Sequence, residues 1–206
     1  MCVNIYKHNI INNKAILMLE KEKEIIIKKI QNSNLDLSLI FSGCGFQFFN
    51  NILKISGSSK FFINAEFPYS KKILESKYLL TKPFVSKVNA EILSSRSMNE
   101  FINLKNNKIL ISIGCVGSIK TYYEKVGDES AWIYLKSSQN QNYYFNLKFN
   151  KNNKLSRENQ DELINISILF VLKKYIDNKY EFKNIKENLN SVFSRLDSSL
   201  IFEEGN

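Results

Sequence analysis

The stretch Leu35–Phe46 combines residue types that serve in phosphate-binding turns and in turns that carry a nucleophile. An apolar run over residues 35–41 leads directly into Ser42-Gly43-Cys44-Gly45, and a helical pattern follows. Glycine lets the backbone approach a ligand closely, and the first turn of a helix offers N–H groups without partners. Ser42 is therefore a candidate nucleophile, with the N–H groups of residues 43–45 as donors to a developing oxyanion. The same serine also fits a plain helix cap.

A second glycine-rich turn is predicted directly after the strand over residues 108–113. It reads Gly114-Cys115-Val116-Gly117-Ser118. In an open α/β sheet, ligands lie beyond the carboxyl ends of the strands, so the two turns are predicted to face one pocket. The ligand-binding residues predicted on this basis are Gly43, Cys44, Gly45, Gly114, Cys115, Gly117 and Ser118.

Cysteine and histidine chemistry has little support in this sequence. Cys44 and Cys115 are candidate thiol nucleophiles, but the single histidine, His8, is far from both, and small turn or core residues are the preferred interpretation. The three cysteines form no paired motif, so we expect no disulfide framework. With so few nitrogen and sulfur ligands, the sequence predicts no metal site and no cofactor.

The elements that must position the two turns alternate between helices and strands. This order, with a hairpin late in the chain, predicts an α/β, three-layer α/β/α domain with a mixed, largely parallel sheet. The expected strands cover residues 36–41, 60–67, 108–113, 130–136 and 142–149. The expected helices cover residues 14–31, 46–53, 71–80 (capped by Ser70), 87–103 (capped by Ser86), 157–175 and 182–201.

We expect three parts along the chain. A polar N-terminal segment covers residues 1–12, and the α/β domain covers residues 13–178. Residues 179–206 are expected to form a C-terminal helix and an acidic tail that pack on or extend the same domain. No internal repeat or linker divides the chain further.

The formal net charge of +9 invites a nucleic-acid interpretation, which the charge pattern argues against. The basic residues are nearly all lysines scattered among asparagine and isoleucine, whereas nucleic-acid surfaces more often cluster arginine with aromatic residues. No apolar run approaches the roughly 18 residues that span a bilayer, and the first residues lack a secretory pattern. We expect a cytoplasmic protein without a membrane partner, and the Phe-rich helix over residues 46–53 suggests a homo-oligomer interface.

Several segments resemble the CinA C-terminal-like family. Gly57-Ser58-Ser59, a strand and Pro68-Tyr69-Ser70 resemble the family's Pro-Gly-Ala-Ser-Ser stretch and the strand that ends in Tyr-Ser. Residues 84–87 resemble its Ala-Val-Ser-Glu helix start. Residues 124–127 and 131–133 resemble its Lys-Pro-Val-Gly-Thr-Val-Trp strand start. The resemblance covers roughly residues 35–175, and its strength is the order and spacing of these segments.

The resemblance implies an activity, because members of the family are similar to amidohydrolases that deamidate nicotinamide mononucleotide without a metal. Alignment on Gly57 without gaps places Ser42 on the family's serine nucleophile and Tyr69 on its tyrosine. Tyr69 would then relay a proton or orient the ligand. The family's glutamate falls on Phe41, and its lysine falls on Leu74.

The displaced lysine leaves two candidate bases. Lys71 and Lys77 lie one helical turn before and after Leu74, so either side chain can reach the same space. A lysine base must lose its proton near pH 7, which requires burial or a neighbouring cation. Each lysine also fits a solvated helix surface.

The glycine turn after the third strand and a later helix resemble a divergent branch of the same family. That branch has Pro-Tyr-Ser without the lysine, a Gly-Cys-Thr-Ala turn and a helix start rich in arginine and glutamate, which Gly114-Cys115 and residues 157–162 resemble. Two hypotheses follow. The chain is either a domain that binds a nucleotide-like small molecule and hydrolyses the amide of a nicotinamide nucleotide, or a catalytically inactive relative that acts in ligand binding or assembly.

Overall fold

A six-stranded mixed sheet forms the centre of the protein in this computed structural model, with strand order β2-β1-β3-β4-β5-β6. The structure describes residues 20–104, 107–123, 125–149, 155–177, 183–184, 187 and 200–205. The strands are β1 (Leu35–Ser42), β2 (Phe62–Glu66), β3 (Ile109–Ser118), β4 (Glu129–Ser137), β5 (Tyr143–Phe149) and β6 (Leu200–Gly205). β1 pairs with β2 and β3 in parallel, and β4, β5 and β6 continue the sheet in antiparallel order.

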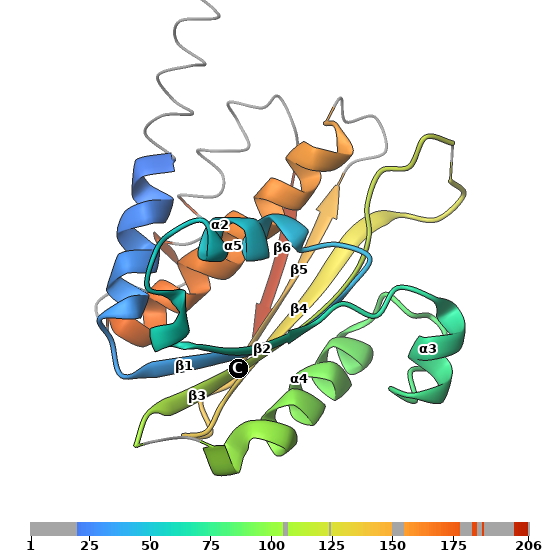
Figure 1. Ribbon diagram of the computed structural model, residues 1–206. Helices are drawn as coiled ribbons and strands as arrows, with labels where there is room; N and C mark the ends of the chain where they lie inside the picture. The colour runs from blue at the N-terminus through green and yellow to red at the C-terminus, as the bar shows by residue number, and fades with distance from the viewer. Residues whose placement is uncertain are drawn as a thin grey trace, which may run out of the picture.

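Helices cover both faces of this sheet (Figure 1). The helices are one over residues 20–31, α2 (Phe46–Leu53), α3 (Lys71–Ser76), α4 (Lys87–Phe101) and α5 (Arg157–Ile176). The helix over residues 20–31, α2 and α5 lie on one face, and α4 and α3 lie on the other. The predicted three-layer α/β/α fold with a mixed sheet is confirmed. The sheet is not largely parallel, however, because only the pairings of β1 with β2 and β3 are parallel, whereas β3–β4, β4–β5 and β5–β6 are antiparallel.

The sequence alternation in β1 sorts its side chains between these two layers. All eight residues of β1 are buried. Leu39 and Phe41 join the core under α2 and α5, whereas Ile40 joins the cluster under α4. Ser38 Oγ hydrogen-bonds Ser97 Oγ of α4 at 2.6 Å. Because successive strand residues point to opposite faces, Ser42 also points to the α4 side.

The helix starts follow the predicted caps. Ser70 Oγ accepts a hydrogen bond from the N–H of Ile73, and Ser86 Oγ accepts one from the N–H of Asn89. α3 is shorter than predicted and ends at Ser76 rather than at residue 80. No helix among the described residues has the length and apolar character needed to cross a bilayer.

The predicted second glycine turn is wrong, because Gly114, Cys115 and Gly117 lie inside β3. The strand continues to Ser118, and β4 pairs with it along this whole stretch. The glycines serve close packing instead of a turn. A Cβ at Gly114 would lie 2.0 Å from the carbonyl oxygen of Ala90, so the absent side chain lets α4 rest directly on the sheet.

The C-terminal prediction also needs correction. Most of the helix expected over residues 182–201 lies outside the described residues, as does the predicted N-terminal segment over residues 1–12. Residues 200–205 form β6, which pairs with β5 from Tyr144 to Phe149. They extend the sheet of the α/β domain, where the sequence suggested the end of a helix and an acidic tail.

The contact between Gly114 and α4 predicts a large effect of Gly114→Ala. The added methyl group would overlap backbone atoms of α4, which have no side-chain freedom to yield, so we expect a loss of about 2 kcal/mol or more in the free energy of unfolding. Gly127→Ala is the matched control, because nothing lies within 4 Å of its Cβ position. Urea unfolding measures both, and equal stability of the two variants would contradict this packing.

Candidate functional site

Ser42 is the last residue of β1, at the carboxyl end of the parallel strands. Its side chain is buried, with 6% exposure, on the side of the sheet that α4 covers. Among the described residues, none forms a hydrogen bond with Ser42 Oγ. The sequence therefore placed this serine correctly at a strand end, where its hydroxyl is available to another partner.

A row of side chains crosses the sheet from Ser42. The strand registers pair Ser42 with Val116, Val116 with Trp132, and Trp132 with Asn146. Paired residues on neighbouring strands share a face, so these four side chains lie side by side on the α4 side. We call them the Ser42 row.

Asn146 is the unusual member of the Ser42 row. It is 1% exposed, and its Oδ1 has no hydrogen-bond donor among the described residues. Buried polar atoms are paired in the large majority of cases, so an unpaired carbonyl oxygen calls for an explanation. An N–H group of a ligand is one donor that could form a hydrogen bond with Asn146 Oδ1.

Aromatic rings flank Asn146 on the same face. Trp132 is half-buried, and its ring centroid lies 6.4 Å from that of Tyr144. Tyr144 stacks on Tyr134 with an interplanar angle of 13°. Lys87 Nζ, at the start of α4, lies 3.5 Å from the centre of the Tyr144 ring. The row is thus bordered by a flat aromatic surface and by a cation.

The glycine turn after Ser42 is occupied by the protein's own carboxylate. Asp161 of α5 accepts hydrogen bonds from the N–H of Gly45 and, at 2.7 Å, from the N–H of Gln47. Burial raises the pKa of Asp161, and these hydrogen bonds and Arg157 oppose that effect only in part. The Gly45 N–H, predicted as an oxyanion donor, is therefore already paired within the protein.

The predicted ligand-binding residues of the two segments meet by direct packing. A Cβ at Gly43 would lie 2.1 Å from the carbonyl oxygen of Gly117. Cys44 and Cys115 are fully buried under α2 and α5, with their sulfur atoms 3.4 Å apart. Burial and the neighbouring Cys44 raise the pKa of Cys115, which disfavours a reactive thiolate. These two cysteines lie on the face opposite Ser42.

Lys77, a predicted base, is held by a carboxylate. Its Nζ lies 2.5 Å from Glu66 Oε2, and Tyr78 donates a hydrogen bond to the same oxygen. The hydrogen bond with Glu66 raises the pKa of Lys77, the opposite of what a general base needs. Burial alone would raise the pKa of Glu66, but the hydrogen bonds from Lys77 and Tyr78 lower it overall.

The remaining predicted catalytic residues lie at the surface. Tyr69 is 69% exposed, and Lys71, the first residue of α3, is also exposed. Leu74, where the family has its lysine, is 6% exposed and packs in the cluster with Tyr78 and Leu80. An apolar side chain therefore fills the place that the resemblance assigns to the base.

Two residues at the start of α5 fix the backbone around the strand ends. Arg157 donates hydrogen bonds to the carbonyl oxygens of Gly43, at 3.2 Å, and Lys120, at 2.9 Å. Gln160 accepts from the N–H of Lys120 at 2.7 Å and donates to Glu129 at 2.6 Å. In the sequence, residues 157–162 only resemble a helix start of the divergent branch. The fold shows that Arg157 and Gln160 connect the end of β1 to the segment after β3 through hydrogen bonds.

Lys125, in the loop between β3 and β4, makes polar contacts that the sequence did not indicate. Its Nζ lies 2.9 Å from Ser118 Oγ and 2.7 Å from the carbonyl oxygen of Ile119. Burial lowers the pKa of Lys125, against the raising effect of Glu129, and Arg157 lowers it further. Within the described part of the chain, no group of three or more side chains could hold a metal ion.

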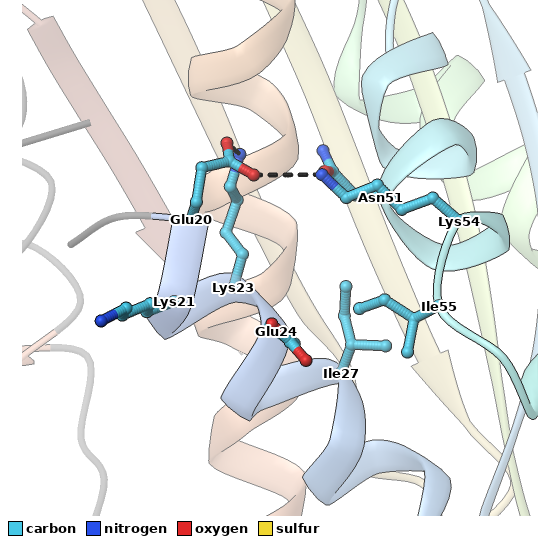
Figure 2. A pocket seen from close by; sticks show the side chains of 8 residues that line it. All are labelled: Glu20, Lys21, Lys23, Glu24, Ile27, Asn51, Lys54 and Ile55. Carbon is cyan, nitrogen blue, oxygen red and sulfur yellow. Dashed lines mark hydrogen bonds and ion pairs between the residues drawn. The ribbon is translucent and has the colours of Figure 1, made fainter. Parts of the chain in front are cut away.

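A separate pocket lies on the opposite face of the sheet, between the helix over residues 20–31 and α2 (Figure 2). Its volume is about 130 Å³, and Glu20, Lys23 and Lys54 in it form ion pairs, as in the contact of 3.0 Å between Glu20 and Lys54. Its lining residues are Glu20, Lys21, Lys23, Glu24, Ile27, Asn51, Lys54 and Ile55. None of them belongs to the predicted site.

Comparison with known proteins identifies the fold. No family model matches the chain, and no curated protein matches its sequence. A competence-damaged protein (CinA) superfamily structure from Enterobacter cloacae matches at 11% identity and a TM-score of 0.58, over 77% of this chain and 92% of that one. A CinA superfamily structure from Klebsiella pneumoniae matches at 11% identity and a TM-score of 0.59, over 77% of this chain and 97% of that one.

A third match is the competence/damage-inducible protein from Agrobacterium tumefaciens, at 13% identity and a TM-score of 0.57. It covers 75% of this chain and 95% of that one. At such low identity the comparisons establish the fold alone. The chain has the fold of CinA superfamily proteins, which confirms the fold that the resemblance implied.

The Glu66 carboxylate predicts a pH-dependent contribution to stability. Since its pKa is lowered in the folded protein, its contribution is present above the ordinary glutamate pKa of about 4.3 and is lost as the pH falls through the lowered value. Glu66→Gln should therefore lower the melting temperature at pH 7, and this difference should shrink toward pH 3. Circular dichroism melts measure it, with Glu24→Gln, from an exposed pair, as a control of smaller effect. A difference that is constant from pH 7 to pH 3 would refute the assignment.

Proposed function

We propose that the chain is a CinA-like protein that binds a nucleotide-like small molecule beside the Ser42 row and does not hydrolyse it. The observation that carries the proposal is the buried, unpaired Oδ1 of Asn146, in one row with Ser42 and the half-buried Trp132. A planar ring that carries N–H groups could donate a hydrogen bond to the unpaired Asn146 oxygen and stack on the neighbouring Trp132 ring.

The chemistry around Asn146 favours a nucleotide-like ligand. Its carbonyl oxygen can accept from the carboxamide of a nicotinamide or from the amino group of a nucleobase. Trp132 offers a face for stacking, and Lys87 supplies a positive charge for a phosphate group. Because Asn146 is 1% exposed, a ligand can reach its Oδ1 only when side chains on this face of the sheet move.

The lysine geometry supports binding without hydrolysis. Lys77 is paired with Glu66, and Leu74 fills the core position where the family's lysine is expected. The N–H of Gly45, which would donate to an oxyanion, already donates its hydrogen bond to Asp161. Ser42 therefore lacks both a base and one of its expected donors, and each is needed for rapid attack on an amide.

A second candidate function is hydrolysis of a nicotinamide nucleotide amide. The position of Ser42 favours it, since the hydroxyl lies at the carboxyl end of β1 without a hydrogen bond from the described residues. In that case Ser42 attacks the amide, Tyr69 assists, and Lys71 acts as the base.

Other aspects of the function stay predictions from the sequence. We expect a cytoplasmic protein that does not use nucleic acid as its main partner. For the expected homo-oligomer, Phe46 and Leu53 are the residues of α2 that an interface would use, because they are 39% and 59% exposed.

Binding at the Ser42 row predicts a fluorescence change, because Trp132 is the single tryptophan of the chain. Nicotinamide mononucleotide should quench its emission saturably. Asn146→Leu should weaken the affinity about tenfold, the effect of one lost hydrogen bond of about 1.4 kcal/mol. Asn165→Leu is the matched control, because its Oδ1 is also unpaired among the described residues but belongs to α5 on the other face. Equal affinity of the two variants would refute this site.

The two candidate functions predict different amounts of ammonia. Purified protein incubated with nicotinamide mononucleotide should release no more ammonia than the Ser42→Ala variant, since no described lysine is placed as a base for Ser42. A coupled glutamate dehydrogenase assay measures the release. Release by the wild type clearly above that of Ser42→Ala would replace the binding proposal with the hydrolase.

A further inference from the structure

The carboxyl end of β3 holds a serine and a lysine in contact. Ser118 is the last residue of β3, and its register with Ser130 of β4 fixes its backbone. Lys125 Nζ lies 2.9 Å from Ser118 Oγ. Both side chains are half-buried, on a part of the strand end that the proposed ligand site does not use.

A third group orients the amine. The carbonyl oxygen of Ile119 accepts a hydrogen bond from Lys125 Nζ at 2.7 Å, and Arg157 of α5 contacts the same carbonyl at 3.5 Å. A nucleophile, a base within hydrogen-bonding distance and a group that orients the base are the parts of an activated serine. Neither Lys71 nor Lys77 has this relation to Ser42.

We infer that Ser118 and Lys125 form a nucleophile–base pair for acyl transfer from small esters or amides. This inference is independent of the proposed ligand at the Ser42 row. It assigns the reactive serine to β3 and its base to the loop between β3 and β4, whereas the resemblance assigned both roles to β1 and α3.

The surroundings of Lys125 favour the neutral amine that a base requires. Burial lowers the pKa of Lys125, and the Arg157 guanidinium on α5 lowers it further. The Glu129 carboxylate at the start of β4 acts in the opposite direction, but the balance is a lowered pKa. Glu129 accepts a hydrogen bond from Gln160 at 2.6 Å, which holds that carboxylate on the side of α5.

The reaction balances with these two residues and water. Ser118 Oγ attacks the carbonyl carbon and forms an ester bond, while neutral Lys125 takes the hydroxyl proton and keeps one N–H on the carbonyl of Ile119. The bond to the leaving group breaks, and Lys125 returns the proton to that group. Water then attacks the acyl-serine, so that the products are a carboxylic acid and free Ser118.

A fluorophosphonate probe tests the pair, because an activated serine displaces fluoride and keeps the phosphonyl group. Incubation of the full chain with the probe, followed by peptide mass spectrometry, should place the label on Ser118. Lys125→Met should slow labelling about 100-fold, the usual contribution of a positioned base. Lys120→Met is the matched control and should be labelled at the wild-type rate.

A further variant separates a base from a structural cation. Lys125→Arg keeps a positive charge and a donor for the carbonyl of Ile119, but guanidinium does not lose its proton at these pH values. It should melt like the wild type and be labelled as slowly as Lys125→Met. The wild-type rate should rise with pH and reach half its maximum below the ordinary lysine pKa of about 10.4. Label on Ser42, absence of label, or a wild-type rate in either Lys125 variant would overturn the inference.

Discussion

The hydrogen bonds that Asp161 accepts from Gly45 and Gln47 hold the turn between β1 and α2 in place. These N–H groups begin α2 inside the core, and a buried N–H group without a partner costs about 1–3 kcal/mol. The carboxylate of α5 therefore does what a capping side chain does in an ordinary helix. Arg157, one turn earlier in α5, binds the carbonyl of Gly43 and holds the same turn from its other side. The position of Ser42 depends on these contacts.

Features that depend on neighbouring residues could be predicted from the sequence. The alternation in β1 and the caps at Ser70 and Ser86 are local, because each residue interacts with residues within about one turn. Glycine has more than one role, and the sequence does not distinguish them. Gly114 looked like part of a turn, but it lies inside β3 because α4 needs close approach there. β6 could not be predicted, since its pairing with β5 joins segments far apart in the chain.

The features of the candidate site also divide into those that a local sequence pattern predicts and those that depend on the folded chain. A strand that runs into glycines was enough to place Ser42 at the end of β1. The relation of Trp132 and Asn146 to Ser42 follows from three strand registers, which no local pattern contains. Asp161 lies 116 positions from Gly45, so only the folded chain brings them together. The contact of Lys125 depends on the path of a loop, which its composition does not specify.

The link between α5 and the end of β1 also has a consequence for biosynthesis. The β4–β5 hairpin needs only its own residues and can form when residue 149 has left the ribosome. The parallel pairing of β1 with β3 needs residues up to 116, and the N–H groups at the start of α2 gain their carboxylate partner only when residue 161 has been made. The segment that is translated early is thus completed late. Until α5 has been made, the N–H groups of Gly45 and Gln47, just after Ser42, lack their carboxylate partner and stay open to a chaperone or a protease.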